Sequence, residues 1–189
     1  ETIVELFIER KGSRDNTGNI YKGRVQRVLP GMQAAFIDIG LERTAFLHAS
    51  DIAKSGMPEN GDEERNIREL VREGDEIMVQ VVKDPLGSKG ARLTTNISIP
   101  SRYMVFMPNV KNVGVSQKIE DEAERVRLKA LVRTLRDESQ GHGYIVRTNA
   151  EGINDFALSA DMVYLGKVWQ AIVERAKTAP PGTCIFEDL

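Results

Sequence analysis

Short runs in which apolar and polar residues alternate fill the first half of the chain, and glycine, proline or polar stretches separate them. Alternation with a period of two indicates a strand with one buried face. Such runs predict five strands, at residues 19–28, 34–39, 45–47, 77–82 and 91–95. The segment "NIRELVRE" before Gly74 predicts one short helical turn among them. Five strands with a helical turn predict a small Greek-key barrel of the OB type.

The pattern changes near Pro100. The segments "RYMVFMP" and "GYIVRTN" alternate like strands, whereas "IEDEAERVRLKALVRTLRDES" between them and residues 156–177 after them have apolar residues at helical spacing. The turn Pro180-Pro181-Gly182 ends the second helix. We therefore expect an α+β protein, in which the barrel is followed by a small α/β unit of at least two strands and two helices. The apolar stripes of the two helices are Ile119, Ala123, Val126, Ala130 and Leu131, and then Ala160, Tyr164, Val168 and Ile172.

Strand parity predicts the direction of two phenylalanines in "GMQAAFIDIGLERTAFLH". Residues two apart share a face of a strand, so Phe36 shares a face with Asp38. Because a carboxylate is rarely unpaired in a core, Ile37 and Ile39 should fill the barrel and Phe36 should face outward. The same parity turns Phe46 outward. The full outward set is Lys22, Arg24, Phe36, Phe46 and His48.

Exposed aromatic rings beside bases suit single-stranded nucleic acid, because the rings stack on bases and the cations follow the phosphates. Lys89, between Ser88 and Gly90, would add a phosphate contact. Alternatively, the two rings cap the barrel under a loop or pack against the second unit. His48 fits a structural hydrogen bond equally well, and single lysines and arginines usually form a solvated face.

Charge and composition restrict the classes of partner, location and site that the chain can have. The net charge of −2 gives no global basic excess, although residues 18–37 contain three bases and no acid. Since no stretch approaches the ~20 apolar residues of a membrane helix and no secretory h-region opens the chain, we expect no membrane partner and a cytoplasmic location. Cys184 is the one cysteine, so an internal disulfide and a cysteine-built zinc site are excluded. No cluster of acids or histidines suggests a metal site.

Three segments carry a family resemblance: "GNIYKGRVQRVLPGMQAAFIDIGLERTAFLHASDI", "MVQVVKDPLGSKGARLTTNISIPSRYMVFMPN" and "GYIVRTNAEG". The first resembles the RNA-binding OB domain named after a ribosomal small-subunit protein. Together they resemble the bacterial ribonuclease E/G family, and its shorter G branch more than its E branch. The resemblance implies RNA-contacting rings at Phe36 and Phe46 and a basic contact at Lys89.

The resemblance also implies that the second unit is a 5′ sensor, a pocket for the terminal phosphate of 5′-monophosphorylated RNA. Its phosphate grip falls on Arg147 and Thr148, and its wall on Val105 and Ser101. The wall position is often glycine in the E branch, which favours a backbone role for Ser101. Arginine offers a planar fork that matches phosphate oxygens. Without the family, an ion pair of Arg147 with an acid such as Glu151 is the simpler reading.

The family implies further parts that this chain lacks. Family members are single-strand-specific endoribonucleases, hydrolases that act in rRNA and tRNA maturation and mRNA decay. A magnesium ion held by aspartates performs the cleavage in a later domain, and a zinc ion is shared between subunits of a homo-oligomer. This chain alone is therefore expected to be inactive and to hold no cofactor. The alternatives are a stand-alone RNA-binding or regulatory module and a protein-protein interaction barrel.

The expected organisation has four parts. Residues 1–17 form a strand and linker left from an enclosing subdomain into which the family inserts the barrel. Residues 18–97 form the OB-fold RNA-binding domain, and residues 98–178 form the 5′-sensor domain. Residues 179–189 return to the enclosing subdomain.

Overall fold

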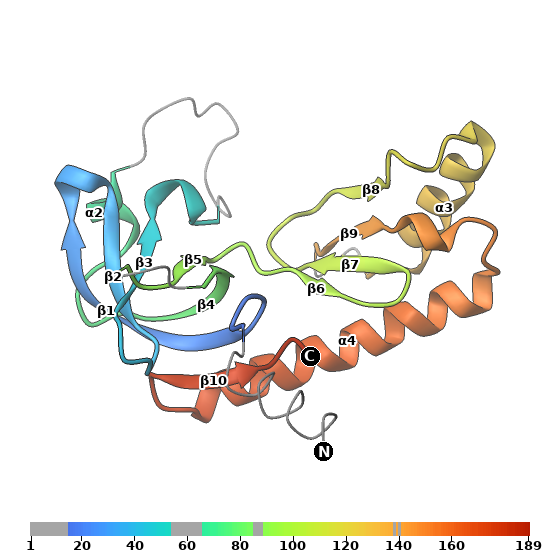
Figure 1. The fold of residues 1–189 in the computed structure, drawn as a ribbon. Helices are drawn as coiled ribbons and strands as arrows, with labels where there is room; N and C mark the ends of the chain where they lie inside the picture. Colours follow the sequence, from blue (N-terminus) through green and yellow to red (C-terminus); the bar gives the residue numbers. More distant parts are fainter. Residues whose placement is uncertain (1–14, 54–65, 85–88, 138, 140) are drawn as a thin grey trace, which may run out of the picture.

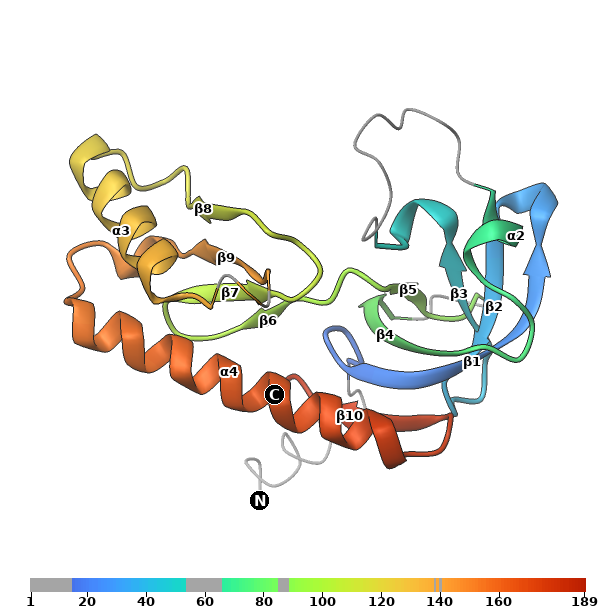
Figure 2. The same cartoon turned by 180° about the vertical axis from the view of Figure 1, so that it is seen from behind.

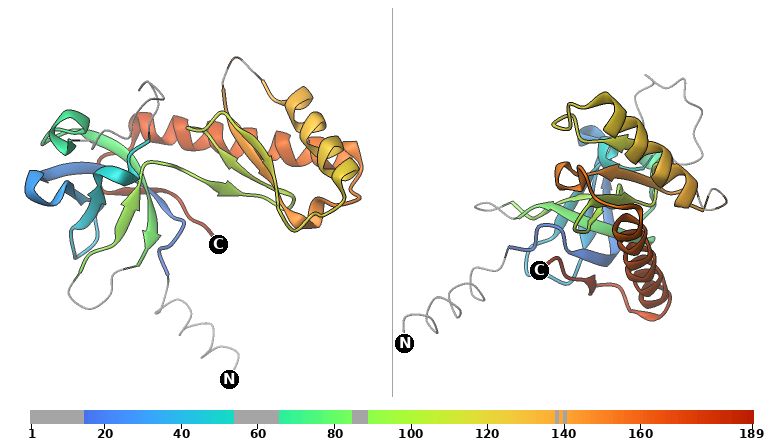
Figure 3. Two further views of the ribbon diagram at one scale, coloured as in Figure 1. Left: turned by 90° about the horizontal axis from the view of Figure 1, so that it is seen from above. Right: turned by 90° about the vertical axis from the view of Figure 1, so that its right-hand side faces the viewer.

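The computed structural model describes residues 15–53, 66–84, 89–137, 139 and 141–189 (Figure 1). The second unit lies along most of a long helix, and the barrel lies beside the C-terminal end of that helix, as the view from above shows (Figure 3). The strand predicted at the start of the chain lies outside the described residues. The predicted boundaries of the four parts stay predictions.

The first unit is the predicted closed barrel of five strands. Its sheet runs in the order β1-β2-β3-β5-β4, and β4 pairs back with β1 to close it. All neighbours are antiparallel except β3 and β5. A single helical turn, α2 (Ile67–Leu70), precedes β4, as "NIRELVRE" predicted. The strands are β1 (Ile20–Leu29), β2 (Ala34–Asp38), β3 (Ala45–His48), β4 (Glu76–Lys83) and β5 (Arg92–Thr94).

Strand parity correctly predicted the interior of the barrel. Ile37, Ile39, Ala45 and Leu47 are at most 1% exposed, and they pack with Val79, Val81 and Leu93 from the opposite strands. The alternate residues of β2 and β3 point outward. The side chains of these two strands therefore divide between core and surface as the sequence indicated.

The second unit is a four-stranded sheet in the order β6-β7-β9-β8. Two of its strands contain the predicted runs, and two very short strands flank them. Helices α3 (Glu122–Leu135) and α4 (Asp155–Thr178) contribute Leu128, Val132, Leu158 and Leu165 to one core with the buried face of the sheet. The other face stays partly open, with Ile145 40% exposed. The strands are β6 (Ile99–Pro100), β7 (Met104–Met107), β8 (Val113–Val115) and β9 (Gly143–Val146).

The predicted apolar stripes of the two helices were partly wrong. Val126 is 60% exposed and Tyr164 is 56% exposed. Ile119 is buried but lies before the start of α3, in a turn, so it does not share the phase of the helix. The side chains that are buried on the two helices are Leu128 and Val132 on α3, and Leu158, Met162, Leu165 and Ile172 on α4.

A strand that the sequence did not predict joins the two units. From behind, α4 runs from the far end of the second unit to the side of the barrel, where β10 (Thr183–Phe186) follows it (Figure 2). β10 pairs antiparallel with the first residues of β1, from Ile20 to Lys22. The amide of Gly182 donates to the Lys22 carbonyl at 2.6 Å. A Cβ atom at Gly40 would lie 2.3 Å from the Gly182 carbonyl oxygen, so the two backbones touch.

Candidate nucleic-acid interface

A row of outward-facing residues crosses the barrel at the level of Phe36. Each member lies directly opposite the next on neighbouring strands. Residues paired in this way on antiparallel strands have Cβ atoms about 4.5–5.5 Å apart. The one parallel pair, on β3 and β5, links the two antiparallel parts, so the row is continuous from β1 to β4. We call it the barrel row, and its members are, in order, Arg27, Phe36, Phe46, Arg92 and Lys83.

The two aromatic rings form the centre of the barrel row. Phe36 is 37% exposed and Phe46 is half-buried. Neither ring belongs to the buried cluster of the barrel or to that of the second unit. Packing against the second unit is therefore not what places them, and their outward direction was predicted correctly.

The bases of the barrel row were missed by the sequence reading. Strict alternation from buried Val25 would bury Arg27, but a register shift between these two residues, a β-bulge, turns Arg27 outward. A second shift, between Val81 and Lys83, does the same on β4. The outward direction of Arg92 could have been predicted from its neighbour Leu93, which is apolar and fully buried, because adjacent residues of a strand face opposite sides. The guanidinium of Arg92 is also held by Asp51, at 3.1 Å.

The predicted bases Lys22 and Arg24 lie away from the barrel row. The Lys22 side chain is only 15% exposed, and its ammonium donates to the Ala176 carbonyl of α4 at 2.7 Å. Lys22 thus faces out of the barrel but is covered by α4, which parity within β1 does not reveal. Arg24 pairs with Glu76 at 3.4 Å.

Lys89 and His48 have different surroundings. Lys89 is exposed, and Gly90 beside it abuts the Thr44 backbone at the start of β3. His48 caps the short helical turn Ala49–Asp51, since its Nδ1 atom accepts from the Ser50 amide at 3.3 Å. These contacts favour a structural hydrogen bond, and not a contact with a ligand, as the role of His48.

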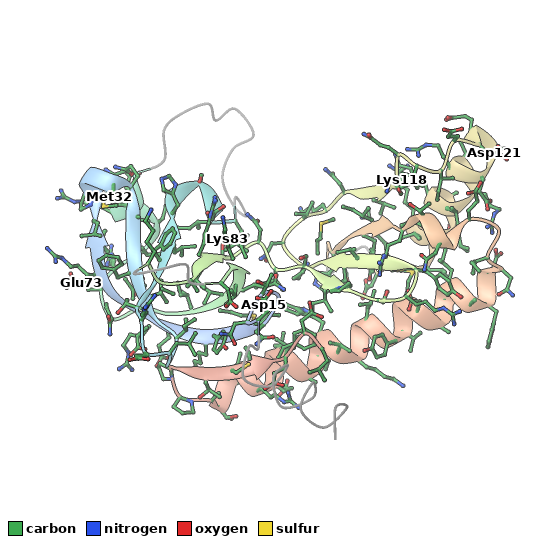
Figure 4. The ribbon with its side chains drawn as sticks, viewed as in Figure 1. Asp15, Met32, Glu73, Lys83, Lys118 and Asp121 are labelled. Atoms are coloured by element: carbon green, nitrogen blue, oxygen red, sulfur yellow. The ribbon has the colours of Figure 1, made fainter. Side chains whose placement is uncertain are left out.

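An open pocket of about 480 Å³ lies in the second unit, where β9 ends. The predicted grip, Arg147 and Thr148, lines it. Val105 lies opposite Ile145 of the lining on the open face of the sheet. The view with side chains places Lys83 on the barrel, and Lys118 in the loop before α3, near Asp121 (Figure 4). The lining residues are Ser116, Lys118, Ile145, Val146, Arg147, Thr148 and Asn149.

Arg147 is held mainly by backbone carbonyls. Its amide donates to the Tyr103 carbonyl at 2.7 Å, and its Nη1 donates to the Ser101 carbonyl, also at 2.7 Å. The ion pairs found within the described part of the chain do not include Arg147, so the alternative pairing with Glu151 is not observed there. A guanidinium has five N–H donors, which leaves part of this fork for a ligand.

The Thr148 hydroxyl is held by the side chain of Ser116, the residue that directly follows β8. Its Oγ1 lies 2.8 Å from Ser116 Oγ, and Ser116 Oγ accepts from the Lys118 amide at 3.3 Å. Ser101, in contrast, donates its hydroxyl to Asp161 at 2.5 Å, away from the pocket. The carbonyl of Ser101, and not its hydroxyl, therefore contacts Arg147.

The first turns of α3 fix both loops that carry the pocket. Arg125 donates to the carbonyls of Ser116 and Ile119, at 2.6 and 3.0 Å. Glu124 accepts from Arg127 and from the Gly152 amide, and these two sets of bonds lower the pKa of its carboxyl to about 2. The loop before α3 and the loop after β9 are thus tied to one helix.

The lowered pKa of Glu124 predicts a pH dependence of stability. A carboxyl whose pKa is lower in the folded chain contributes stability above its unfolded value of 4.5, and this contribution is lost as the pH falls through about 2. We expect the melting temperature of the wild type to exceed that of Glu124→Gln near neutral pH, and the gap to narrow steadily in acid. Thermal melts of both proteins across this range measure it. A gap that stays constant with pH would show that the carboxylate charge has no such role.

No helix within the described ranges is long and apolar enough to cross a membrane. The same residues contain no group of three or more histidine, cysteine, aspartate or glutamate side chains placed to hold a metal ion.

The chain is similar to curated ribonucleases over almost its full length. It is 58% identical to ribonuclease G of Escherichia coli over 93% of this chain and 36% of the relative, and 53% identical to ribonuclease G of Haemophilus influenzae over 97% and 38%. Identity to ribonuclease E of Escherichia coli is lower, 38% over 100% of this chain and 18% of the relative. The predicted likeness to the G branch is confirmed. The chain spans about a third of the length of the ribonuclease G relatives, 36% and 38%.

Two family models divide the chain between them. The S1 RNA-binding domain matches residues 14–94, which include the barrel and its row. The ribonuclease E/G family matches residues 98–189, which include the pocket, both long helices and β10. Both domains imply RNA binding. The chain thus carries an S1 RNA-binding domain and belongs, through residues 98–189, to the ribonuclease E/G family.

Proposed function

We propose that this chain is the RNA-binding and 5′-monophosphate-sensing region of a single-strand-specific endoribonuclease of the ribonuclease G type. The observation that carries the proposal is the pocket at the end of β9, where an arginine fork and a threonine hydroxyl converge. The S1 domain on the same chain supplies the surface for the strand. The parent enzyme would act in the cytoplasm, in rRNA and tRNA maturation and mRNA decay.

In this proposal the barrel row holds single-stranded RNA. Successive bases stack on Phe36 and Phe46, and stacking does not depend on base identity because every base has a flat π-face. Arg27 and Lys83 at the two ends of the row, with Lys89 nearby, neutralise phosphates along the strand. Asp51 offsets the charge of Arg92, so Arg92 serves mainly as a wall beside Phe46.

The pocket would read the 5′ end by charge and geometry. A terminal phosphate carries about −1.5 to −2 charges at neutral pH and three acceptor oxygens. The free part of the Arg147 fork binds two of these oxygens, and Lys118 adds a second cation. The Ser116 hydroxyl accepts from the Lys118 amide. In this proposal it donates in turn to Thr148, which leaves the Thr148 hydroxyl proton for the phosphate. A 5′-hydroxyl offers neither the charge nor the oxygens.

Cleavage itself would need parts of the parent protein beyond this chain. A magnesium ion held by aspartates would supply the hydrolysis, and a zinc ion would join subunits of a homo-oligomer. Several acids of the described residues take part in ion pairs or begin helices, such as Glu124 with Arg127 and Asp121 at the start of α3. We therefore expect this chain alone to bind RNA without cutting it.

Matched RNAs that differ only at the 5′ end test the proposal. The chain should bind the 5′-monophosphate form more tightly than the 5′-hydroxyl form in a fluorescence anisotropy titration. Both affinities should fall steeply as salt rises, because bound cations release counterions from the RNA. Equal affinity for the two ends would contradict the sensor. Absence of salt-dependent RNA binding would point to a protein partner for the barrel instead.

A further inference from the structure

Asp161, in the second turn of α4, makes two hydrogen bonds to one turn of the second unit. Its Oδ2 atom accepts from the Ser101 hydroxyl at 2.5 Å and from the Tyr103 amide at 3.0 Å. The turn is closed by a bond from the Ser101 amide to the Met104 carbonyl at 2.8 Å. Asp161 is half-buried, so both bonds form in a partly desolvated place.

The carbonyls of the same turn face the pocket. Those of Ser101 and Tyr103 accept from the side chain and the amide of Arg147, and that of Arg102 accepts from Asn149 at 2.7 Å. Three consecutive carbonyls thus hold two residues of the pocket lining. The carboxylate of Asp161 thus accepts hydrogen bonds from the donor groups of the turn, and the pocket residues donate hydrogen bonds to the carbonyls of the turn.

We propose that Asp161 is a positioning residue for the pocket: it fixes the turn of residues 101–103 and thereby aims the guanidinium of Arg147. The inference rests on the proposed binding of a 5′-phosphate by Arg147. Asp161 does not line the pocket and acts only through the turn. Without its carboxylate, the Tyr103 amide loses its acceptor, and the Ser101 hydroxyl keeps only the Met104 carbonyl, at 3.0 Å. The turn then has one unsatisfied donor and loses both bonds that tie it to Asp161 on α4.

Asp161→Asn and Asp161→Ala separate positioning from charge. The asparagine carbonyl oxygen accepts both bonds, so Asp161→Asn should keep the preference for a 5′-monophosphate over a 5′-hydroxyl within about twofold, a change under 0.5 kcal/mol. Asp161→Ala removes both bonds and should lower the preference by about tenfold. Binding of the 5′-hydroxyl RNA should stay unchanged in both variants. Affinities come from anisotropy titrations of this chain with short matched RNAs.

Controls keep the outcomes distinct. Glu174→Ala on the same helix removes an exposed carboxylate that pairs with Lys177, and it should leave the preference intact. If Arg147→Ala leaves the preference intact, the proposed function fails. If Arg147→Ala removes the preference and Asp161→Ala keeps it, the function stands and the role of Asp161 is overturned.

A further variant covers loss of folding. If Asp161→Ala does not give a cooperative thermal melt, Ser101→Ala decides, because it removes one bond to Asp161 and leaves the Tyr103 bond in place. It also removes the bond of the Ser101 hydroxyl to the Met104 carbonyl, but the Ser101 amide still donates to that carbonyl and keeps the turn closed. A lowered preference at an unchanged melting temperature supports the positioning role. An unchanged preference overturns it.

Discussion

Arg147→Ala should abolish the preference for a 5′-monophosphate over a 5′-hydroxyl. Hydrogen bonds to charged groups are worth about 1.5–3 kcal/mol each, so the loss of the fork should lower the preference by about tenfold or more. Affinity for 5′-hydroxyl RNA should not change, because the barrel row is intact. The measurement is a pair of titrations with RNAs that differ only at the 5′ end, and in the full-length parent enzyme the ratio of kcat/KM for the same pair.

Two control variants sharpen this test. Arg133→Ala removes an exposed arginine near the end of α3, outside the pocket lining, and should leave the preference unchanged. Arg147→Lys keeps the charge but loses the planar fork, so it should recover only part of the preference. An unchanged preference in Arg147→Ala would remove the sensor assignment.

The double substitution of Phe36→Ala with Phe46→Ala should weaken binding of single-stranded RNA regardless of its 5′ end. Stacking is worth about 1–3 kcal/mol per base, so two rings together account for roughly 2–6 kcal/mol. The expected signature is a large rise in Kd with an unchanged ratio between the two 5′ ends. A filter-binding titration with unstructured RNA measures it.

The melting temperature distinguishes stacking from packing. Because neither ring belongs to a buried cluster, the double variant should melt close to the wild type. Met32→Ala, which removes another exposed apolar side chain of the barrel (67% exposed), is the matched control and should bind RNA normally. Equal RNA affinity with a lowered melting temperature would mean that the rings serve the fold.

The barrel was predictable because local rules act strongly there. Alternation in β2 and β3 and the charge of Asp38 suffice to turn Phe36 outward, and the buried residues obey the same rule. The rule failed for Arg27 because a bulge inserts one extra residue, and bulges leave little trace in composition. Alternation within β1 also does not reveal that α4 covers Lys22, because α4 comes much later in the chain.

The candidate site was less predictable because its contacts are far apart in sequence. Arg147 and Thr148 were identified through the family resemblance, and an arginine after an apolar strand does not by itself indicate a phosphate. Ser116 and Asp161 take part through loops and a helix that only the fold brings to the end of β9. Strands of two or three residues, such as β6 and β8, carry too few residues for a periodic signal.

The pairing of β10 with β1 has a consequence for how the chain is made. One side of Ile20–Lys22 is occupied by β4, and among the described residues the other side is occupied by β10 alone, which follows α4. During synthesis the barrel strands emerge first, and this edge of β1 keeps unpaired backbone groups until β10 arrives. An open edge invites pairing with other chains. A shortened gene product that ends after β5 should therefore be prone to aggregation, although all five barrel strands are present.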